Sequence, residues 1–290
     1  MAEVFGVVSG AVSVAALFNN CVGCFEYIQL GRHFAQNYER CQLKLDIART
    51  RLSRWGQAVA IHQNPRFIAD NPDDKSVQQV QDILEQIVEL FQTLENASKR
   101  YTKYAGKDDV EHLSVQTMQP VAQKLHRRLG EIAAQRQKGT SFVKKAAWAL
   151  YDEKHFNKLV GEIAEFVGAL EMLFPASESA RRALVEVEIE EVDDEPSLDT
   201  LQKAATNTDD ILAQVVAKRL ETYGSRNYAK DVRSEEKARV RVGDEWAEVA
   251  VGRGLVSHGP TSNEADSVTA RGTSAVHIGN SYGGRGIFDS

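Results

Sequence analysis

The stretch NYAKDVRSEEKARVRVGDEWA, residues 227–247, returns thirty-six residues later as NEADSVTARGTSAVHIGNSYG, residues 263–283. The two copies align without a gap, so that Asn227 meets Asn263 and Val242 meets Ile278. Repeats of this length that are rich in Val and Gly usually stack as rungs, because each rung has a face that it cannot bury alone. The pair therefore predicts a two-rung structural repeat in the last third of the chain.

Apolar and polar residues alternate within each copy, most clearly from Ala238 to Val242. This is the period of a strand with one buried face. Gly243 and Gly279 follow the strands directly, where a tight bend would require a positive φ. The predicted apolar core of the rungs consists of Ala229, Val232, Val240, Val242, Ala265, Val268, Val276 and Ile278.

Stacked in-register strands place equivalent residues about 4.8 Å apart, so identical amides form ladders and opposite charges attract. The two copies follow this rule at three positions. The predicted ladder and charge pairs are Asn227 with Asn263, Lys230 with Asp266, and Glu235 with Arg271.

The ends of a two-rung stack are open. Nine Lys plus Arg and nine Asp plus Glu between residues 226 and 290 leave no net charge to oppose further stacking. Open strand edges recruit further copies, which is the route to a fibril. A small soluble β-helix, or a disordered tail with chance similarity, is the alternative that the residues leave open.

Composition narrows the function classes. The chain has 290 residues, 42% hydrophobic and 26% charged, with a net charge of -6 and no basic stripe, which argues against nucleic-acid binding. Cys21 and Cys24 have CxxC spacing but no second pair, so we expect no metal site, and three cysteines favour a reducing cytosol. No HExxH, GxGxxG or phosphate-loop motif is present, so we expect no catalytic residues, no cofactor and no enzyme activity.

The N-terminal stretch from Val4 to Phe25 contains no charged residue and is long enough, as a helix, to cross a hydrocarbon core of about 30 Å. A helix that is apolar all round is also typical of the core of a bundle. Both interpretations stay open, and they are compatible if the helix is buried in one state and released in another. The candidate membrane-active residues are Val4, Phe5, Val8, Val12, Ala16, Leu17 and Phe18.

The region before residue 225 is predicted to be an all-α bundle without strands, and the loss of leucine after it marks a domain boundary near Gly224. The prediction is a helical domain at 1–224 and a repeat domain at 225–290. Apolar spacing of three and four residues predicts helices over 34–59, from a cap at Asp73 or Asp74 towards Tyr101, from Pro120, over 141–174, near 178–192 and over 197–220.

Particular stretches carry a family resemblance that covers nearly the whole chain: LFNNC (17–21), YERCQL (38–43), LHRRL (125–129), AWALYD (147–152) and IGN (278–280). With these stretches, the chain resembles the fungal HET-s/HET-S prion and heterokaryon-incompatibility proteins. That family combines an N-terminal helical HeLo domain with a C-terminal prion-forming domain.

The resemblance implies a two-part switch that ends in programmed cell death. The tail is expected to be disordered when soluble and a two-rung β-solenoid when amyloid, with Ile287 and Phe288 packed over it. Another amyloid, either the protein itself or a NOD-like receptor with a similar motif, templates the tail. Conversion strains the helices before Gly224 and releases the first helix into membrane lipids, where homo-oligomers form pores. The protein is then cytoplasmic before activation and at the cell membrane or in aggregates afterwards.

The resemblance also leaves a second role open. Some family members are silent partners that form prions but do not kill, and they differ near the joint after the first helix. This chain has His33 there rather than proline, so we expect His33 to mark the switch joint and favour a killing-competent form. The alternatives are a silent prion partner, or a scaffold whose tail binds a partner without pore formation.

Overall fold

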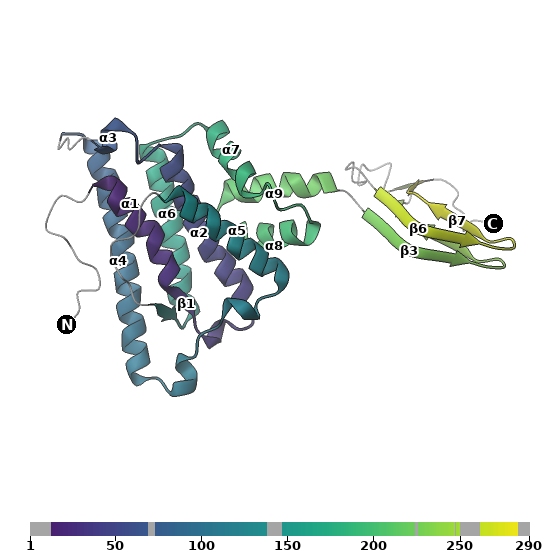
Figure 1. Ribbon diagram of the computed structural model, residues 1–290, viewed down its shortest axis with the longest axis horizontal. Helices are drawn as coiled ribbons and strands as arrows, with labels where there is room; N and C mark the ends of the chain where they lie inside the picture. Colours follow the sequence, from purple (N-terminus) through teal and green to yellow (C-terminus); the bar gives the residue numbers. More distant parts are fainter. Residues whose placement is uncertain are drawn as a thin grey trace. The chain divides into compact units, whose positions relative to one another are not determined.

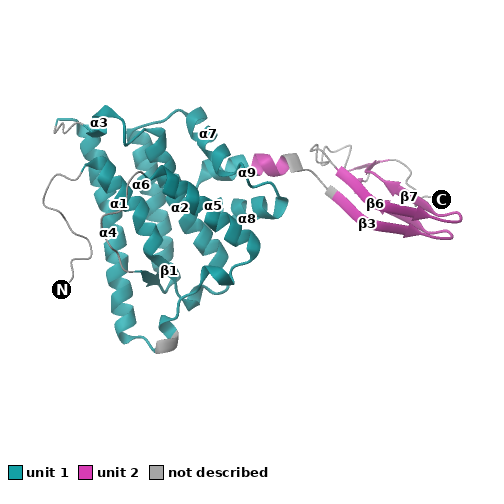
Figure 2. Cartoon of the chain, in the orientation of Figure 1, with its two compact units in different colours: residues 1–216 teal, residues 217–290 magenta. Residues whose placement is uncertain are grey.

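The structure is a computed structural model that describes residues 13–68, 73–137, 147–223, 226–246, 248–249 and 262–283. The chain divides into two compact units, Met1–Val216 and Ala217–Ser290, drawn in separate colours in Figure 2. The division falls within the last helix, so the end of that helix belongs to the same unit as the repeats.

Helices make up most of the described part of the first unit (Figure 1). They are α1 (Val14–Cys24), α2 (Tyr38–Ala58), α3 (Pro65–Ile68), α4 (Lys75–Tyr104), α5 (Pro120–Arg136), α6 (Glu153–Leu173), α7 (Glu178–Glu188), α8 (Glu195–Ala205) and α9 (Asp210–Tyr223). Short 3-10 turns lie at Phe25–Tyr27, Arg32–Phe34, Lys107–Val110 and Val115–Thr117. The predicted helical bundle is therefore confirmed.

Helix starts follow local chemistry. The Asp74 carboxylate accepts the Val77 amide N–H at 3.2 Å and caps α4, as the sequence predicts. Pro120 occupies the first turn of α5, where its missing N–H costs nothing. Ser13 caps α1 in the same way as Asp74 caps α4, through its hydroxyl and the Ala16 N–H.

Helix α2 is the centre of the bundle, in contact with α1, α5, α6, α7 and α8, while α1 packs mainly on α4. Leu43, Ile47 and Leu52 on α2 are fully or almost fully buried. Burying side chains of this size stabilises a fold by about 1.5–3 kcal/mol each. Helix α2 therefore contributes to the buried packing of five other helices.

The expectation of no strand before residue 225 is wrong. Strand β1 (Ile28–Leu30) pairs in parallel with β2 (Trp148–Leu150), with Ile28 opposite Trp148. The predicted helix over 141–174 therefore starts only at Glu153 in the structure, and Trp148 is buried in a strand instead. The region predicted as one helix over 197–220 consists of α8 and α9, separated by a turn at Asn207 with φ of 62°. Strands of three residues are too short for alternation to be recognised in the sequence.

The second unit carries the repeats as three two-stranded parallel sheets (Figure 1). The first repeat forms β3 (Arg226–Ser234), β4 (Arg239–Val242) and β5 (Glu245–Trp246), and the second forms β6 (Ser262–Ala270), β7 (Ala275–Ile278) and β8 (Ser281–Tyr282). Strand β3 pairs with β6, β4 with β7, and β5 with β8. We call residues 227–247 rung 1 and residues 263–283 rung 2.

Candidate functional site: stacked rungs, a seated first helix and a buried polar network

The rungs pair in the register of the repeat. Asn227 lies opposite Asn263, Val232 opposite Val268, and Val242 opposite Ile278. Because the pairing is parallel and the offset is constant, the paired strand residues of rung 1 lie beside the residues thirty-six positions later in rung 2. This arrangement brings the sequence-predicted apolar, amide and turn positions together in pairs.

Apolar side chains of the two rungs differ in exposure. Val232 in rung 1 is 6% exposed, whereas its partner Val268 in rung 2 is 44% exposed. Ile278 is also exposed, and Ala229, Val240, Val242, Ala265 and Val276 are half-buried. The predicted apolar residues therefore lie opposite one another in the paired strands, but Val268 and Ile278 of rung 2 are exposed to solvent. Ile287 and Phe288 lie outside the described residues.

The turns after the second strand of each rung require glycine. Gly243 and Gly279 have φ of 152° and 148°. A Cβ on Gly243 would lie 2.1 Å from the Gly279 carbonyl oxygen, which is an impossible contact with backbone. A Cβ on Gly279 would meet only the His277 ring, at 3.3 Å. The bend at Gly243 is therefore fixed by a close backbone approach as well as by φ.

An amide ladder crosses the rungs. The Asn227 amide donates to the Asn263 side-chain oxygen at 3.0 Å, and Asn263 donates to the Asn280 side-chain oxygen at 3.0 Å. Asp266 accepts a hydrogen bond from the Tyr228 hydroxyl rather than from Lys230. Glu235 and Arg271 are both exposed, at the turn that follows β3 and β6. The structure therefore contains a hydrogen bond between Asn227 and Asn263 across the rungs, and Asp266 is bound by the Tyr228 hydroxyl.

The first helix is seated in the bundle by its apolar face. Phe18 is fully buried and Leu17 is 9% exposed, while Ala16 faces solvent. The Phe18 ring lies over Gly56 of α2 so closely that a Cβ there would be 2.2 Å from its Cζ atom. Cys21 donates its S–H to the Leu84 carbonyl oxygen of α4 at 3.2 Å. Val4, Phe5, Val8 and Val12 lie outside the described residues.

Within the part of the chain that the structure describes, no helix has the length and apolar character to cross a membrane. Across the same residues, no group of three or more His, Cys, Asp or Glu is placed to hold a metal ion. Cys21, Cys24 and Cys41 are buried and form no disulfide.

His33 lies in the 3-10 turn between β1 and α2. Its Nε2 atom is 3.5 Å from the Tyr101 hydroxyl, and the Tyr101 ring stacks on Tyr151 with centroids 4.6 Å apart. A Cβ on Gly31 would meet the Tyr151 ring at 2.6 Å. The joint after the first helix is therefore packed against the end of α4 and against the residue that follows β2.

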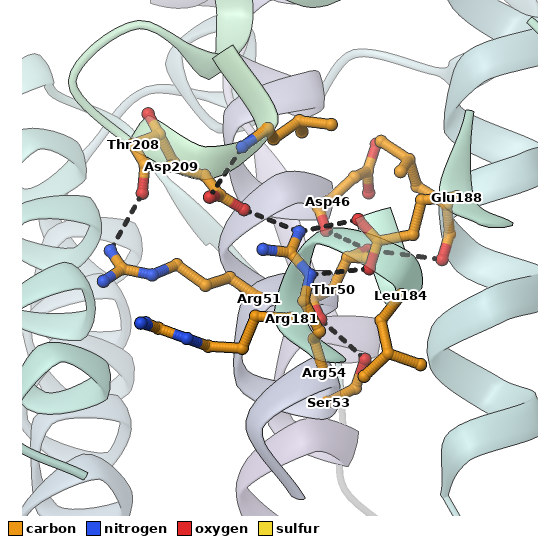
Figure 3. A network of polar contacts seen from close by, with 12 residues as sticks. Asp46, Thr50, Arg51, Ser53, Arg54, Arg181, Leu184, Glu188, Thr208 and Asp209 are labelled. Atoms are coloured by element: carbon orange, nitrogen blue, oxygen red, sulfur yellow. Dashed lines mark hydrogen bonds and ion pairs between the residues drawn. The ribbon is translucent and has the colours of Figure 1, made fainter. Parts of the chain in front are cut away.

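A buried polar network on α2 was not predicted from the sequence (Figure 3). The Arg54 guanidinium is 2% exposed and donates to both carboxylate oxygens of Glu188 on α7, at 2.8 and 2.6 Å. It also donates to Asp209, which precedes α9, at 2.7 Å. Arg136 of α5 donates to Glu188 at 2.6 Å. We call Arg54, Arg136, Glu188 and Asp209 the Arg54 network.

The network holds the start of α9. Asp209 accepts the Leu212 amide N–H at 3.2 Å with its other oxygen, so one carboxylate caps α9 and pairs with Arg54. Burial raises the pKa of Asp209, but the charge and hydrogen bonds of Arg54 outweigh it and hold that pKa below its ordinary value. Arg51 of α2 adds a hydrogen bond to the Thr208 carbonyl oxygen at 3.2 Å. No sequence pattern marks the contacts of Arg51 and Arg54, because their partners are 134 to 157 residues away along the chain.

The fold and the rungs define a class of protein: a helical domain joined to a repeat that stacks in parallel register. A family model described as prion-inhibition and propagation, HeLo, matches residues 6–201, and a second, described as Het-s 218-289, matches residues 219–283. Heterokaryon incompatibility protein s of Podospora anserina is 48% identical over 290 residues, covering 100% of both chains. Heterokaryon incompatibility protein S of the same fungus is 47% identical over the same coverage.

Solved structures agree with the helical part. The HET-s N-terminal domain matches with a TM-score of 0.71 and 49% identity, covering 73% of this chain and 99% of that chain. A mutant of that domain matches with a TM-score of 0.70 and 50% identity, covering 72% of this chain and 99% of that chain. One of its changes is from proline to histidine at position 33, the number that His33 has here. The chain belongs to the HET-s family of heterokaryon incompatibility prion proteins.

Proposed function

We propose that this protein is a signalling amyloid that kills by breaching membranes. Templating by another copy, or by a NOD-like receptor with a similar repeat, folds the tail into stacked rungs. The parallel, in-register pairing of the rungs is the observation that carries the proposal, since its open edges accept a further rung. Before activation the protein is cytoplasmic, and afterwards it acts at the cell membrane or in aggregates.

Templating reaches the first helix through α9 and α2. The end of α9, from Ala217, belongs to the same compact unit as the rungs, and its start is capped by Asp209 in the Arg54 network. Tension on α9 from the converting tail withdraws Asp209 from Arg54 and leaves buried charge unpaired. Removing one partner from a buried ion pair costs about 3–5 kcal/mol, which is a large part of a domain's stability.

Release of α1 follows because its seat is on the same helix as Arg54. Phe18 packs on Gly56, and its ring centroid lies 6.1 Å from that of Trp55. Trp55 and Gly56 are the two residues that follow Arg54 in α2. Loss of order in this turn of α2 removes the Gly56 and Trp55 surface that holds Phe18, which leaves α1 held mainly by its contact on α4. The uncharged stretch from Val4 to Phe25 then enters lipid, where oligomers of it form the pore.

The test uses seeds of residues 226–290 and the full chain with dye-loaded vesicles. We expect the seeds to be fibrils with a repeat of about 4.8 Å, to convert the full chain, and to cause dye release only when both are present. A tail that stays monomeric would contradict the proposal. Conversion of the full chain without dye release would favour the silent prion or scaffold role instead.

A further inference from the structure

Helix α5 carries a basic group of side chains that the proposed function does not use. Lys124, Arg127 and Arg128 have the spacing of one helix face, and α5 contains a single acidic residue, Glu131. The three cations line a groove of about 310 Å³ on the side of α5 that meets Glu191. We call Lys124, Arg127 and Arg128 the α5 basic face.

The stretch that joins α7 to α8 is acidic and lies over this face. We call residues 189–194, IEEVDD, the acidic connector. Glu191 pairs with Arg128 at 3.0 Å, and Asp193 pairs with Lys124 at 3.4 Å. Helix α5 also contacts both α7 and α8, the helices on either side of the connector (Figure 1). The connector therefore covers the α5 basic face with its own carboxylates.

The connector satisfies the cations only in part. The Arg128 side chain is 18% exposed, and its Nε atom is buried without a hydrogen-bond partner among the described residues. Lys124 and Asp193 are both exposed, and exposed ion pairs are weak and screened by salt. A phosphate group offers more acceptor oxygens than one carboxylate, and guanidinium groups bind it with two parallel hydrogen bonds. Phosphate chemistry therefore suits the α5 basic face better than the connector does.

One arginine holds the chain on both sides of the connector. Glu188 directly precedes the connector, Asp209 follows α8, and Arg54 pairs with both carboxylates. In the proposed function, tension on α9 withdraws Asp209 from Arg54. The segment 188–209 would then lose its attachment at the end nearer the rungs, and the connector could leave α5.

We propose that the α5 basic face binds the phosphate groups of an anionic membrane and that the acidic connector covers it until the tail converts. The inference rests on the proposed function and specifies which surface meets the lipid. The chain has a net charge of -6, so away from this face an anionic membrane repels it. Each Lys or Arg beside such a membrane strengthens binding about fivefold, so three together strengthen it on the order of 100-fold.

The first test uncovers the face without seeds. Full-length protein carries Glu191→Gln and Asp193→Asn, while Asp194 is kept because it caps α8. Binding is measured by flotation with vesicles of phosphatidylcholine, with or without phosphatidylserine. We expect the variant to bind the serine-containing vesicles at least about fivefold more tightly than the unmodified chain and to gain nothing on phosphatidylcholine.

The matched control is Glu178→Gln with Asp199→Asn, which changes the net charge equally. These residues pair with Arg182 and Lys203 and not with α5. We expect the control to bind as the unmodified chain does. Equal gains in the two variants would overturn the inference, because net charge alone would then explain the binding.

A second pair of variants tests the cations. Lys124→Gln with Arg127→Gln, added to the connector variant, should abolish the gain on serine-containing vesicles. Lys154→Gln with Lys158→Gln on α6 removes as many exposed cations and should leave the gain in place. Retained binding without the α5 cations would assign the gain to another surface. Binding of inorganic phosphate without binding of vesicles would assign the face to a soluble anion and overturn the membrane assignment.

Seeding separates this inference from the proposed function. With fibrils of residues 226–290, full-length Lys124→Gln with Arg127→Gln should convert at the unmodified rate but float with serine-containing vesicles about 25-fold less tightly. Equal flotation of the two converted chains would overturn the inference alone. An unmodified chain that does not convert, or that converts without dye release, refutes the proposed function, and the unseeded arms still decide whether the connector covers a lipid-binding face.

Discussion

At Arg54, a single guanidinium joins carboxylates from two other parts of the chain inside the helical unit. Both Glu188 and Asp209 are 1% exposed, so neither can exchange the ion pair for water without local opening. Buried pairs of this kind add little net stability over apolar packing, but losing one member is costly. The residue is therefore suited to hold α7 and the start of α9 in one arrangement until a competing force acts.

Replacing Arg54 alone should show this cost. We expect Arg54→Met to lower the free energy of unfolding by about 3–5 kcal/mol, because Asp209 would lose its buried ion pair and Glu188 would keep only Arg136. Urea unfolding followed by tryptophan fluorescence measures it. Adding Glu188→Gln and Asp209→Asn should restore part of the loss.

The matched control is Lys203→Met, which breaks the exposed pair of Lys203 with Asp199 on α8. Exposed pairs contribute up to about 1 kcal/mol. Equal destabilisation by the two Met variants would contradict the role given to the Arg54 network.

His126 gives the helical unit a dependence on pH. Its Nδ1 atom lies 2.7 Å from Asp46, and the hydrogen bond to that carboxylate raises the pKa of His126, although burial and Arg49 lower it. A raised folded pKa stabilises the fold fully below the unfolded value of about 6.5, and the stabilisation is lost as pH rises through the folded pKa. We therefore expect urea midpoints to fall from pH 6 to pH 8, and His126→Gln to flatten that slope. An unchanged slope in the variant would assign the dependence to another group.

At the scale of elements, α1 and α2 meet at a contact that leaves no room for a methyl group. We expect Gly56→Ala to displace the Phe18 ring and to speed hydrogen exchange of the α1 amides, because the added Cβ would lie within 3 Å of three ring atoms. Gly130→Ala on α5 is the matched control, since nothing lies within 4 Å of its Cβ position. That control should stabilise the helix by about 0.5–1 kcal/mol. Unchanged exchange of α1 in Gly56→Ala would mean that α1 is not held at this contact.

The rungs offer a second matched pair. Gly243→Ala and Gly279→Ala impose similar backbone strain, but only the first puts a Cβ against backbone, 2.1 Å from the Gly279 oxygen. We expect Gly243→Ala to abolish tail fibrils in thioflavin assays and Gly279→Ala to delay them. Equal effects would mean that φ alone, and not the close approach of the rungs, governs the turn.

Sequence patterns predict local features and repeats, but they do not predict which residues pair when the partners are far apart in the chain. The repeat specifies which strands pair and in which register, and Asp74 and Pro120 mark helix starts by chemistry within a few residues. The β1 and β2 strands are too short for alternation to be visible, and β1 finds its partner about 120 residues later in the chain. Arg54 also looks like one more cation on the polar face of an amphipathic helix. Only tertiary packing buries it, so its partners follow from the fold and not from α2 itself.

At the scale of the whole molecule, rung stacking in the tail and release of the first helix involve residues in two different units. Rung stacking acts on the tail, and α9 continues from the tail into the helical unit, where Asp209 meets Arg54. Arg54 lies one residue before Trp55 and two before Gly56, which form the seat of Phe18. The proposed coupling is therefore a path of contacts along α9 and one turn of α2.

Hydrogen exchange during seeding tests this coupling most directly. Full-length protein is mixed with fibrils of residues 226–290 in the absence of vesicles, and amide exchange is followed by mass spectrometry while the tail converts. We expect residues 17–24 of α1 to lose protection in step with conversion, while the α4 amides from Leu84 to Phe91 stay protected. Unseeded protein, and protein seeded with an unrelated fibril, should keep α1 protected. A converted tail beside an α1 that remains fully protected would contradict the claim that stacking of the rungs releases the first helix.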